Sequence, residues 1–213
     1  GPYRTACKSR LLAGLAALQL VLEMDVVERL LDYIELLADR NQQTNLTAVR
    51  DPLEMVTRHL LDAFSIAPYV QGRSLIDIGS GAGLPGIPLA LIAPERRVLL
   101  VDSNGKKARF LREAVEKLRL NNTQVEQQRV EQITEHFDCV TARAFASLEK
   151  MLKLGGHLLA LDGIWLAQKG RYPETEITAV PKSFMVTAIH KLHVPGLEAE
   201  RHLIIIRHAR AGR

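Results

Sequence analysis

The sequence predicts an α/β fold in which a mostly parallel sheet is preceded by a helical cap. Two patterns along the 213 residues support this prediction. Up to residue 73 apolar side chains recur at helical spacing, and from residue 74 short apolar strands alternate with helical stretches. Such alternation is typical of βαβ units, because parallel strands need a crossover connection. We therefore divide the chain into a helical cap, residues 1–73, and an α/β domain, residues 74–213.

Three helices are expected in the cap. Leucines at helical spacing mark the first, Leu11–Leu22, which is too short to span a bilayer and precedes an acidic segment rather than a cleavage site. We therefore expect a cytoplasmic protein that does not associate with membranes. A second amphipathic helix covers residues 26 to about 41. The third opens at Asp51-Pro52, an N-cap followed by proline at the first helical position, and ends before Pro68.

Seven strands are expected after the cap, with helices between most of them. The strands are Ser74–Ile78, Val98–Asp102, Gln124–Gln128, Asp138–Ala142, Ile164–Ala167, Phe184–Val194 and His202–His208. The helices are Gly86–Ile92, Asn104–Leu120 and Leu148–Leu154. The last two strands form a pair joined by a turn at Pro195-Gly196.

Composition excludes several classes of protein. Hydrophobic residues make up 47% and charged residues 24%, close to the globular average, which excludes disordered and fibrous chains. The two cysteines, Cys7 and Cys139, are too few for a disulfide framework or a zinc cluster, so we expect no metal and a reducing compartment. The net charge of +4 is only a weak indication of an anionic partner.

The segment Leu75–Leu89 (LIDIGSGAGLPGIPL) is the most informative stretch of the chain. A strand ends in Asp77 and is followed by four glycines, namely Gly79, Gly81, Gly83 and Gly86. Glycines there let the chain turn sharply and let a ligand approach bare backbone at a helix N-terminus. A dinucleotide pyrophosphate would be repelled by Asp77, whereas a cationic ligand would be attracted, and Pro85 and Pro88 leave a less open amide nest. S-adenosylmethionine, a cation without phosphate, satisfies both conditions.

Asp102 supports the same ligand. It ends the second strand about 20 residues after the loop, where an acid accepts hydrogen bonds from ribose hydroxyls. An alternative is that Asp102 only caps the helix that carries Lys106 and Lys107.

With these residues in place, eight segments carry a resemblance to a known family. They are NLTAVRDP (45–52), RHLLD (58–62), IDIGSGAGLPGIPLA (76–90), VDSNGKKARFL (101–111), RVE (129–131), RAFASL (143–148), KG (169–170) and VPGLEAERHL (194–203). Over residues 24 to 208 the chain resembles the glucose-inhibited division protein B family, also called ribosomal small-subunit methyltransferase G. The resemblance implies a class I S-adenosylmethionine-dependent methyltransferase: a Rossmann-like fold with a seven-stranded, mostly parallel sheet. It also implies methyl transfer to N7 of one guanine in small-subunit (16S) ribosomal RNA, free or within the 30S particle.

The resemblance and the residue patterns together indicate roles for individual residues. Arg143 is expected to face both the cofactor and the target base, and Arg143 and Lys169 are the expected catalytic residues. The expected cofactor-binding residues are Asp77, Gly79, Gly81, Gly83, Leu84, Asp102, Val130, Glu131 and Arg143, with Val130 and Glu131 against the adenine. The expected RNA-binding residues are Asn45, His59, Lys106, Lys107, Arg129 and Arg201. Phe145 is a candidate surface on which a base stacks.

The chemistry agrees with these residues. Guanine N7 carries a lone pair at neutral pH, so no general base is needed and catalysis rests on proximity and orientation. Cys139 lies within a predicted strand and is expected in the core rather than as a nucleophile. An alternative for Arg143 is a salt bridge at the rim of the sheet, for instance with Asp138 or Glu149.

Three other functions remain open at this stage. One is a nicotinamide-dependent oxidoreductase on the same fold. Another is a noncatalytic RNA- or ribosome-binding protein that retains a cofactor pocket. The third keeps methyl transfer but changes the acceptor to a small molecule or a protein. We expect the chain to act as a monomer.

Overall fold

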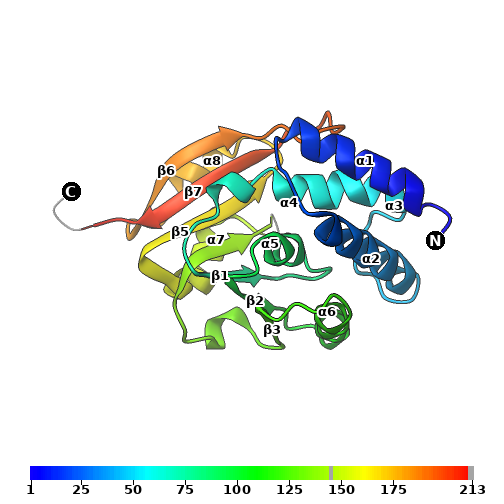
Figure 1. The fold of residues 1–213 in the computed structure, drawn as a ribbon. Coiled ribbons are helices and arrows are strands. Elements are labelled where there is room, and N and C mark those ends of the chain that lie inside the picture. The colour runs from blue at the N-terminus through cyan, green and yellow to red at the C-terminus, as the bar shows by residue number, and fades with distance from the viewer. Residues whose placement is uncertain (144–145, 211–213) are drawn as a thin grey trace.

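The computed structural model describes residues 1–143 and 146–210, so Phe145 lies outside the described residues (Figure 1). Its strands are β1 (Ser74–Ile78), β2 (Arg97–Val101), β3 (Thr123–Glu126), β4 (Phe137–Ala142), β5 (Leu159–Lys169), β6 (Phe184–Lys191) and β7 (His202–His208). Its α-helices are α1 (Arg4–Ala17), α2 (Met24–Asn41), α3 (Pro52–Met55), α4 (Asp62–Phe64), α5 (Gly86–Ile92), α6 (Gly105–Lys117), α7 (Leu148–Gly155) and α8 (Glu174–Thr178). A π-helical segment, η1 (Val56–Leu61), joins α3 to α4, and short 3₁₀ turns include η3 (Val130–Gln132).

The seven strands form one sheet in the order β3-β2-β1-β4-β5-β7-β6. Strands β1 to β5 run parallel to one another, and β7 runs antiparallel between β5 and β6. This confirms the predicted α/β fold with a seven-stranded, mostly parallel sheet. The strand order reverses at β1, which places β1 and β4 side by side at the point where doubly wound sheets bind ligands.

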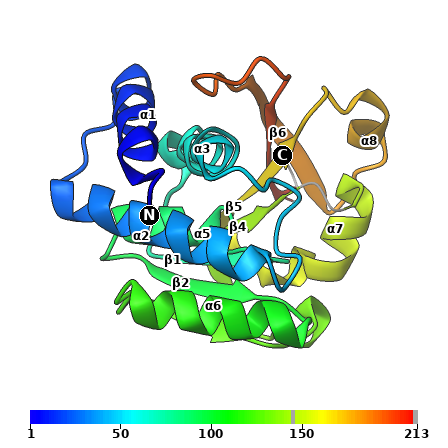
Figure 2. The same ribbon diagram turned by 90° about the vertical axis from the view of Figure 1, so that its right-hand side faces the viewer.

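The sheet separates two hydrophobic cores. Alternate side chains of β1 enter different cores: Leu75 packs with the helices α1, α2, α5 and α6, whereas Ile76 and Ile78 pack with α7. Figure 2 shows α7 and α8 on the right, apart from α1, α2 and α3 at the left and centre. The N-terminal helices therefore extend the core on one face of the sheet. The second predicted helix of the cap, residues 26 to about 41, corresponds to α2.

Several element boundaries differ from the prediction. Helix α1 begins at Arg4 and ends at Ala17, because Arg4 forms ion pairs with α2 and Gln19 adopts a left-handed φ of 56°. The predicted helix, Leu11–Leu22, was based on the spacing of the leucines alone, so both of its ends lie too far along the chain. Strand β5 begins five residues earlier than predicted, and the five-residue helix α8 was not predicted at all.

The prediction that Cys139 belongs to the core is confirmed. Cys139 of β4 is fully buried, and burial raises the pKa of its thiol to about 12. A thiol with that pKa is protonated near neutral pH, so Cys139 packs as a core side chain. Among the described residues, no helix is both long and apolar enough to cross a membrane.

Candidate active site

The carboxyl edge of the parallel strands gathers most of the predicted site residues. Ile78 of β1 is paired with Val101 of β2 on one side and with Ala142 of β4 on the other. The next residues along these three strands are Gly79, Asp102 and Arg143. Register therefore brings together residues that are up to 64 positions apart in the sequence.

The loop after β1 requires its glycines. Gly79, Gly81 and Gly83 have φ values of 66°, 56° and 91°, in the left-handed region that favours glycine. A Cβ on Gly83 would lie 2.3 Å from Cδ1 of Ile87 in the first turn of α5. The loop therefore depends on backbone conformation, and Leu84 is buried beneath it with only 5% of its surface exposed.

Asp77 supports this loop from within. Its Oδ2 accepts hydrogen bonds from Ser80 Oγ at 3.0 Å and the Gly86 amide at 3.0 Å, while Oδ1 accepts one from Thr141 Oγ1 at 3.0 Å. The side chain is fully buried, which raises the pKa of the carboxyl to about 7 despite these donors. Asp77 thus braces the loop, and direct contact with the cofactor stays a prediction.

A cavity of about 320 Å³ opens beside the loop. It is lined by Ile78, Gly79, Val101, Asp102, Ser103, Gln128, Arg129, Val130, Glu131 and Leu154. Four of the predicted cofactor residues, from β1, β2 and η3, therefore share one cavity. Arg129, predicted for RNA, lies at the same cavity.

Asp102 links the loop to the start of α6. One carboxylate oxygen accepts the Gly81 amide at 2.9 Å and the other accepts the Asn104 amide at 2.9 Å. Asn104, and not Asp102, is the N-cap of α6, since its side chain accepts the amides of Lys106 and Lys107. The capping alternative for Asp102 is therefore wrong, although Asp102 does orient the residue that caps the helix.

A second group of side chains lies at the ends of β4 and β5, around Asp62 of α4. The Asp62 carboxylate accepts Nε and Nη2 of Arg201 at 2.7 and 2.9 Å, Nη2 of Arg143 at 3.2 Å and Nε2 of Gln168 at 3.2 Å. The partner of Arg143 is thus Asp62, and not Asp138 or Glu149. Arg201, predicted for RNA, uses two of its N–H groups on the same carboxylate.

Lys169 closes this group from the end of β5. Its ammonium donates to the carbonyl of Ala146 at 2.6 Å and pairs with Glu176 of α8 at 2.9 Å. Glu176 also accepts the amide of Leu148, the first residue of α7, at 2.9 Å. In this structure Lys169 therefore contacts Ala146 and Glu176, and a direct catalytic contact stays a prediction.

The polar loop between α2 and α3 is organised by Asn41. Its Oδ1 accepts the amides of Leu46 and Thr47 at 2.9 and 3.0 Å. Thr47 in turn contacts Nε2 of His59 on η1 at 2.8 Å. His59 is buried, and burial together with the nearby Arg143 lowers its pKa to about 4, so the imidazole is neutral at neutral pH.

The remaining predicted RNA-binding residues lie at the surface. Asn45 and Lys106 are exposed, Arg129 is exposed beside the cavity, and Lys107 is half-buried. Their backbone positions follow the loop before α3, the start of α6 and the turn before η3. The residues 1–143 and 146–210 contain no cluster of three or more His, Cys, Asp or Glu side chains suited to a metal.

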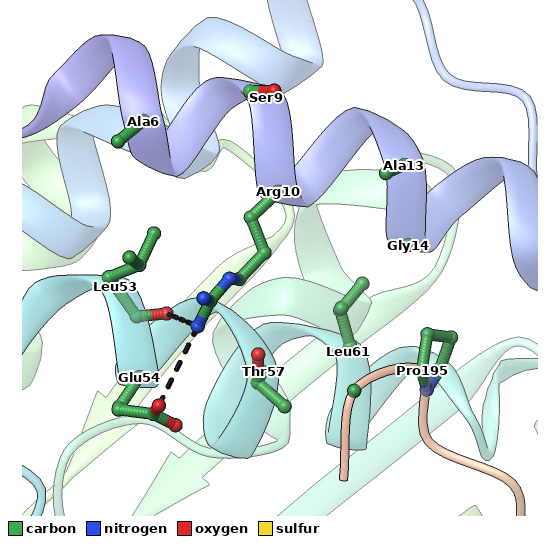
Figure 3. Close-up of a pocket in the computed structure, with 11 residues that line it drawn as sticks. Ala6, Ser9, Arg10, Ala13, Gly14, Leu53, Glu54, Thr57, Leu61 and Pro195 are labelled. Carbon is green, nitrogen blue, oxygen red and sulfur yellow. Dashed lines mark hydrogen bonds and ion pairs between the residues drawn. The ribbon is translucent and has the colours of Figure 1, made fainter.

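Another cavity, of about 600 Å³, lies elsewhere (Figure 3). It lies between α1 and the α3–η1 segment, with Pro195 and Gly196 at its edge. Arg10 crosses it to the carbonyl of Leu53 at 3.2 Å and to the carboxylate of Glu54 at 3.7 Å. Its charged groups therefore contact one another, and it contains none of the residues predicted for the site.

Sequence reasoning missed several residues that build the site. Asp62 stood in the RHLLD segment, but a single acid within a helix carries no signal of burial. Gln168 of β5 and Glu176 of α8 were likewise not singled out, and neither was Tyr33 of α2, which donates to the carbonyl of Ala82 in the glycine loop at 2.6 Å. Only for Asn41 was a signal present, because an asparagine at the end of a helix often organises the following turn.

Comparison with protein families identifies a relationship over most of the chain. The sequence profile of the family described as rRNA small subunit methyltransferase G matches residues 26–204. A protein named ribosomal RNA small subunit methyltransferase G from Xanthomonas axonopodis pv. citri is 52% identical over 180 residues, covering 84% of this chain and 85% of that protein. One of the same name from Stenotrophomonas maltophilia is 47% identical over 207 residues, covering 96% and 97%.

Solved structures show a related fold at low sequence identity. TYW2 of M. jannaschii in complex with AdoMet has a TM-score of 0.55 at 14% identity, covering 70% of this chain and 75% of that one. TrmN of Thermus thermophilus has a TM-score of 0.53 at 17% identity, covering 70% and 47%. At these identities the likeness concerns the fold alone, that of class I methyltransferases.

Proposed function

Because this chain belongs to the rRNA small subunit methyltransferase G family, we propose that it methylates N7 of a guanine in 16S ribosomal RNA, with S-adenosylmethionine as the methyl donor. The observation that carries the proposal is the shared carboxyl edge. There Gly79, at the start of the glycine loop, lies between Asp102 on one side and Arg143, the residue expected to face the base, on the other. A cofactor site and an acceptor site meet at that edge.

The described residues fit the cofactor. The left-handed glycine loop offers backbone at close approach, and Asp102 places a carboxylate at the end of β2, where ribose hydroxyls are bound in this class of fold. Val130 and Glu131 also line the cavity. Ligand cavities begin at roughly 300 Å³, so a cavity of about 320 Å³ suits the adenosine half of the molecule. When bound, the cofactor supplies an electrophilic methyl group on a sulfonium.

The acceptor side fits a base that needs no deprotonation. Guanine N7 presents its lone pair directly, so the protein has only to orient the base and exclude water. His59 is neutral and buried, and Asp77 is occupied inside the loop, so neither is placed as a general base. Arg143 keeps a third of its side chain exposed, which leaves part of its guanidinium open for the guanine edge or the cofactor carboxylate.

We assign contacts with the RNA backbone to surface residues of the helical cap and of the surface beside the cofactor cavity. We assign Asn45 and the N-terminal helical cap to the acceptor, together with Lys106, Lys107 and Arg129 beside the cofactor cavity. Phosphate contacts of this kind position RNA without reading its sequence. The protein is proposed to act in the cytoplasm, as a monomer, on small-subunit RNA or on the 30S particle.

The test is methyl transfer from labelled S-adenosylmethionine to small-subunit RNA from cells that lack the enzyme, offered free and as 30S particles. We expect label at one guanine, located by cleavage chemistry that selects N7-methylated guanine. Arg143→Ala should lower turnover about 100-fold while leaving the circular dichroism spectrum unchanged.

A matched control is Arg97→Ala, which removes an exposed arginine paired with Glu135 at the opposite end of β2. This variant should transfer methyl groups at the same rate as the unmodified protein. Label absent from RNA at every assembly stage would overturn the proposal. Tight binding of NAD(H) without binding of S-adenosylmethionine would support an oxidoreductase instead.

A further inference from the structure

Asp62 is a buried acid at the carboxyl edge of the sheet. The sequence motifs do not specify a role for it. Only 2% of its surface is exposed, yet its carboxylate meets four N–H groups from three other segments. Arg143 follows β4, Gln168 lies in β5 and Arg201 precedes β7. A charge removed from water in this way is stable only when donors surround it.

The geometry of these contacts is unequal. Arg201 donates hydrogen bonds from Nε and Nη2 to both oxygens of Asp62, at 2.7 and 2.9 Å. This bidentate arrangement fixes the plane of the carboxylate. Gln168, itself only 1% exposed, adds a third N–H at 3.2 Å. Arg201 and Gln168 thus hold Asp62 in place, and Asp62 is the fixed point of the group.

Arg143 is the member with the fewest contacts to Asp62 and the more exposed of the two arginines. It contacts Asp62 through Nη2 alone, at 3.2 Å, and its side chain is 33% exposed, against 17% for Arg201. A planar guanidinium held at one nitrogen is restricted in direction but keeps its other N–H groups for a ligand. Two guanidinium groups share one carboxylate, so the group keeps one net positive charge beside the cofactor loop.

We propose that Asp62 is a positioning residue for methyl transfer, which aims the unused N–H groups of Arg143 at the cofactor and the guanine. Arg201 and Gln168 act through Asp62 by holding the carboxylate still. Since Asp62 belongs to α4, the N-terminal part of the chain takes part in building the reaction centre. The proposal rests on the proposed function and names a further residue of the same site.

The test is a double-mutant cycle of Asp62→Asn and Arg143→Ala, with turnover measured on small-subunit RNA. Asp62→Asn alone should lower kcat about tenfold or more. If Asp62 acts through Arg143, adding Asp62→Asn to Arg143→Ala should change kcat less than about twofold. A purely structural role would instead multiply the two losses, so the cycle distinguishes positioning from support of the fold.

A matched control is Glu113→Gln, which also neutralises a carboxylate paired with an arginine, here Arg40 of α2. That pair is half-buried between α2 and α6 and includes none of the residues placed in the site, so kcat should be unchanged. If Asp62→Asn does not fold, the same cycle is run with Asp62→Glu, which keeps the charge that the arginines require and moves it by one methylene. The expected non-additivity is the same.

The outcomes separate the two proposals. No transfer by the unmodified protein would overturn the proposed function, and this inference with it. Transfer by the unmodified protein with multiplied losses in the double variant, or with full kcat in the Asp62 variant, would overturn this inference alone. A lowered kcat that disappears in the Arg143→Ala background would support it.

Discussion

The carboxyl edge has two sides, the proposed cofactor side around Asp77 and Asp102 and the proposed acceptor side around Asp62. The two sides are held together in different ways. On the cofactor side, Asp77 contacts residues three and nine positions ahead as well as Thr141 of β4, and Asp102 contacts Gly81, 21 positions earlier. On the acceptor side, Asp62 contacts residues 81, 106 and 139 positions away. Most of these bonds on the cofactor side thus involve a short motif, whereas every one of those on the acceptor side joins segments that only the assembled sheet brings together.

The two sides also hold their buried titratable groups in opposite ways. Burial raises the pKa of Asp77 on the cofactor side to about 7 and lowers that of His59 on the acceptor side to about 4. In both cases desolvation disfavours the charged form. Both groups therefore favour their neutral forms, whereas the buried Asp62 carboxylate is stabilised as a charge by the arginines around it.

Gly79→Val should have the largest effect, and only on the cofactor side. Valine at a φ of 66° is strained, and its side chain would stand where the ligand approaches the loop. We expect the affinity for S-adenosylmethionine to fall about 100-fold or more, as measured by isothermal titration.

Gly196→Val is the matched control for this prediction. Gly196 has a φ of 82°, and a Cβ there would lie 3.6 Å from the nearest side-chain atom, an ordinary contact. It carries similar backbone strain far from the loop, so cofactor affinity should be retained while stability falls. Equal losses of affinity in both variants would contradict a local role for the glycine loop.

The pH dependence of stability should separate the two buried groups. Between about pH 4 and 7 the unfolded state ionises at residue 77 before the folded state does, so the contribution of Asp77 to stability falls as pH rises. Between about pH 6.5 and 4 the unfolded state protonates His59 and the folded state does not, so its contribution falls as pH falls. Shifts of this size correspond to roughly 3 to 5 kcal/mol.

Two variants reveal these opposing contributions in urea unfolding across that window. Asp77→Asn should gain stability relative to the unmodified protein as pH rises, and His59→Gln should gain it as pH falls. Both replacements keep a polar atom for the existing hydrogen bonds. Curves that stay parallel to that of the unmodified protein would show that the group in question does not titrate differently on folding.

Tyr33→Phe should have the smallest effect of the three, at a contact between the N-terminal helices and the cofactor loop. It removes the hydrogen bond from the fully buried Tyr33 to the carbonyl of Ala82, which costs about 1 to 3 kcal/mol because a buried acceptor loses its donor. Thermal unfolding measures the loss. Tyr69→Phe, at a partly buried ring that stacks on His190, is the control and should cost less than about 0.5 kcal/mol. Equal losses would show that the bond to Ala82 adds no stability.

The sequence by itself determined the fold class and the cofactor side. Alternating strands and helices predicted the parallel sheet, and glycines at left-handed positions predicted the loop, because backbone conformation limits which residue types can stand there. The register of β1 against β2 in the structure places Asp102 beside Gly79, at the loop where the sequence predicted the ligand. Helix ends were predicted less well, since ion pairs such as those of Arg4 leave no periodic signal.

Only the tertiary structure decided the acceptor side. Asp62 reads as an ordinary helical acid until the order of the sheet brings Arg143, Gln168 and Arg201 around it. The same holds for Lys169, whose partner Glu176 lies on a helix that the sequence did not predict. The physical reason is that a buried ion pair depends on which segments become neighbours and on the loss of water around them, and neither property belongs to a residue or its local spacing.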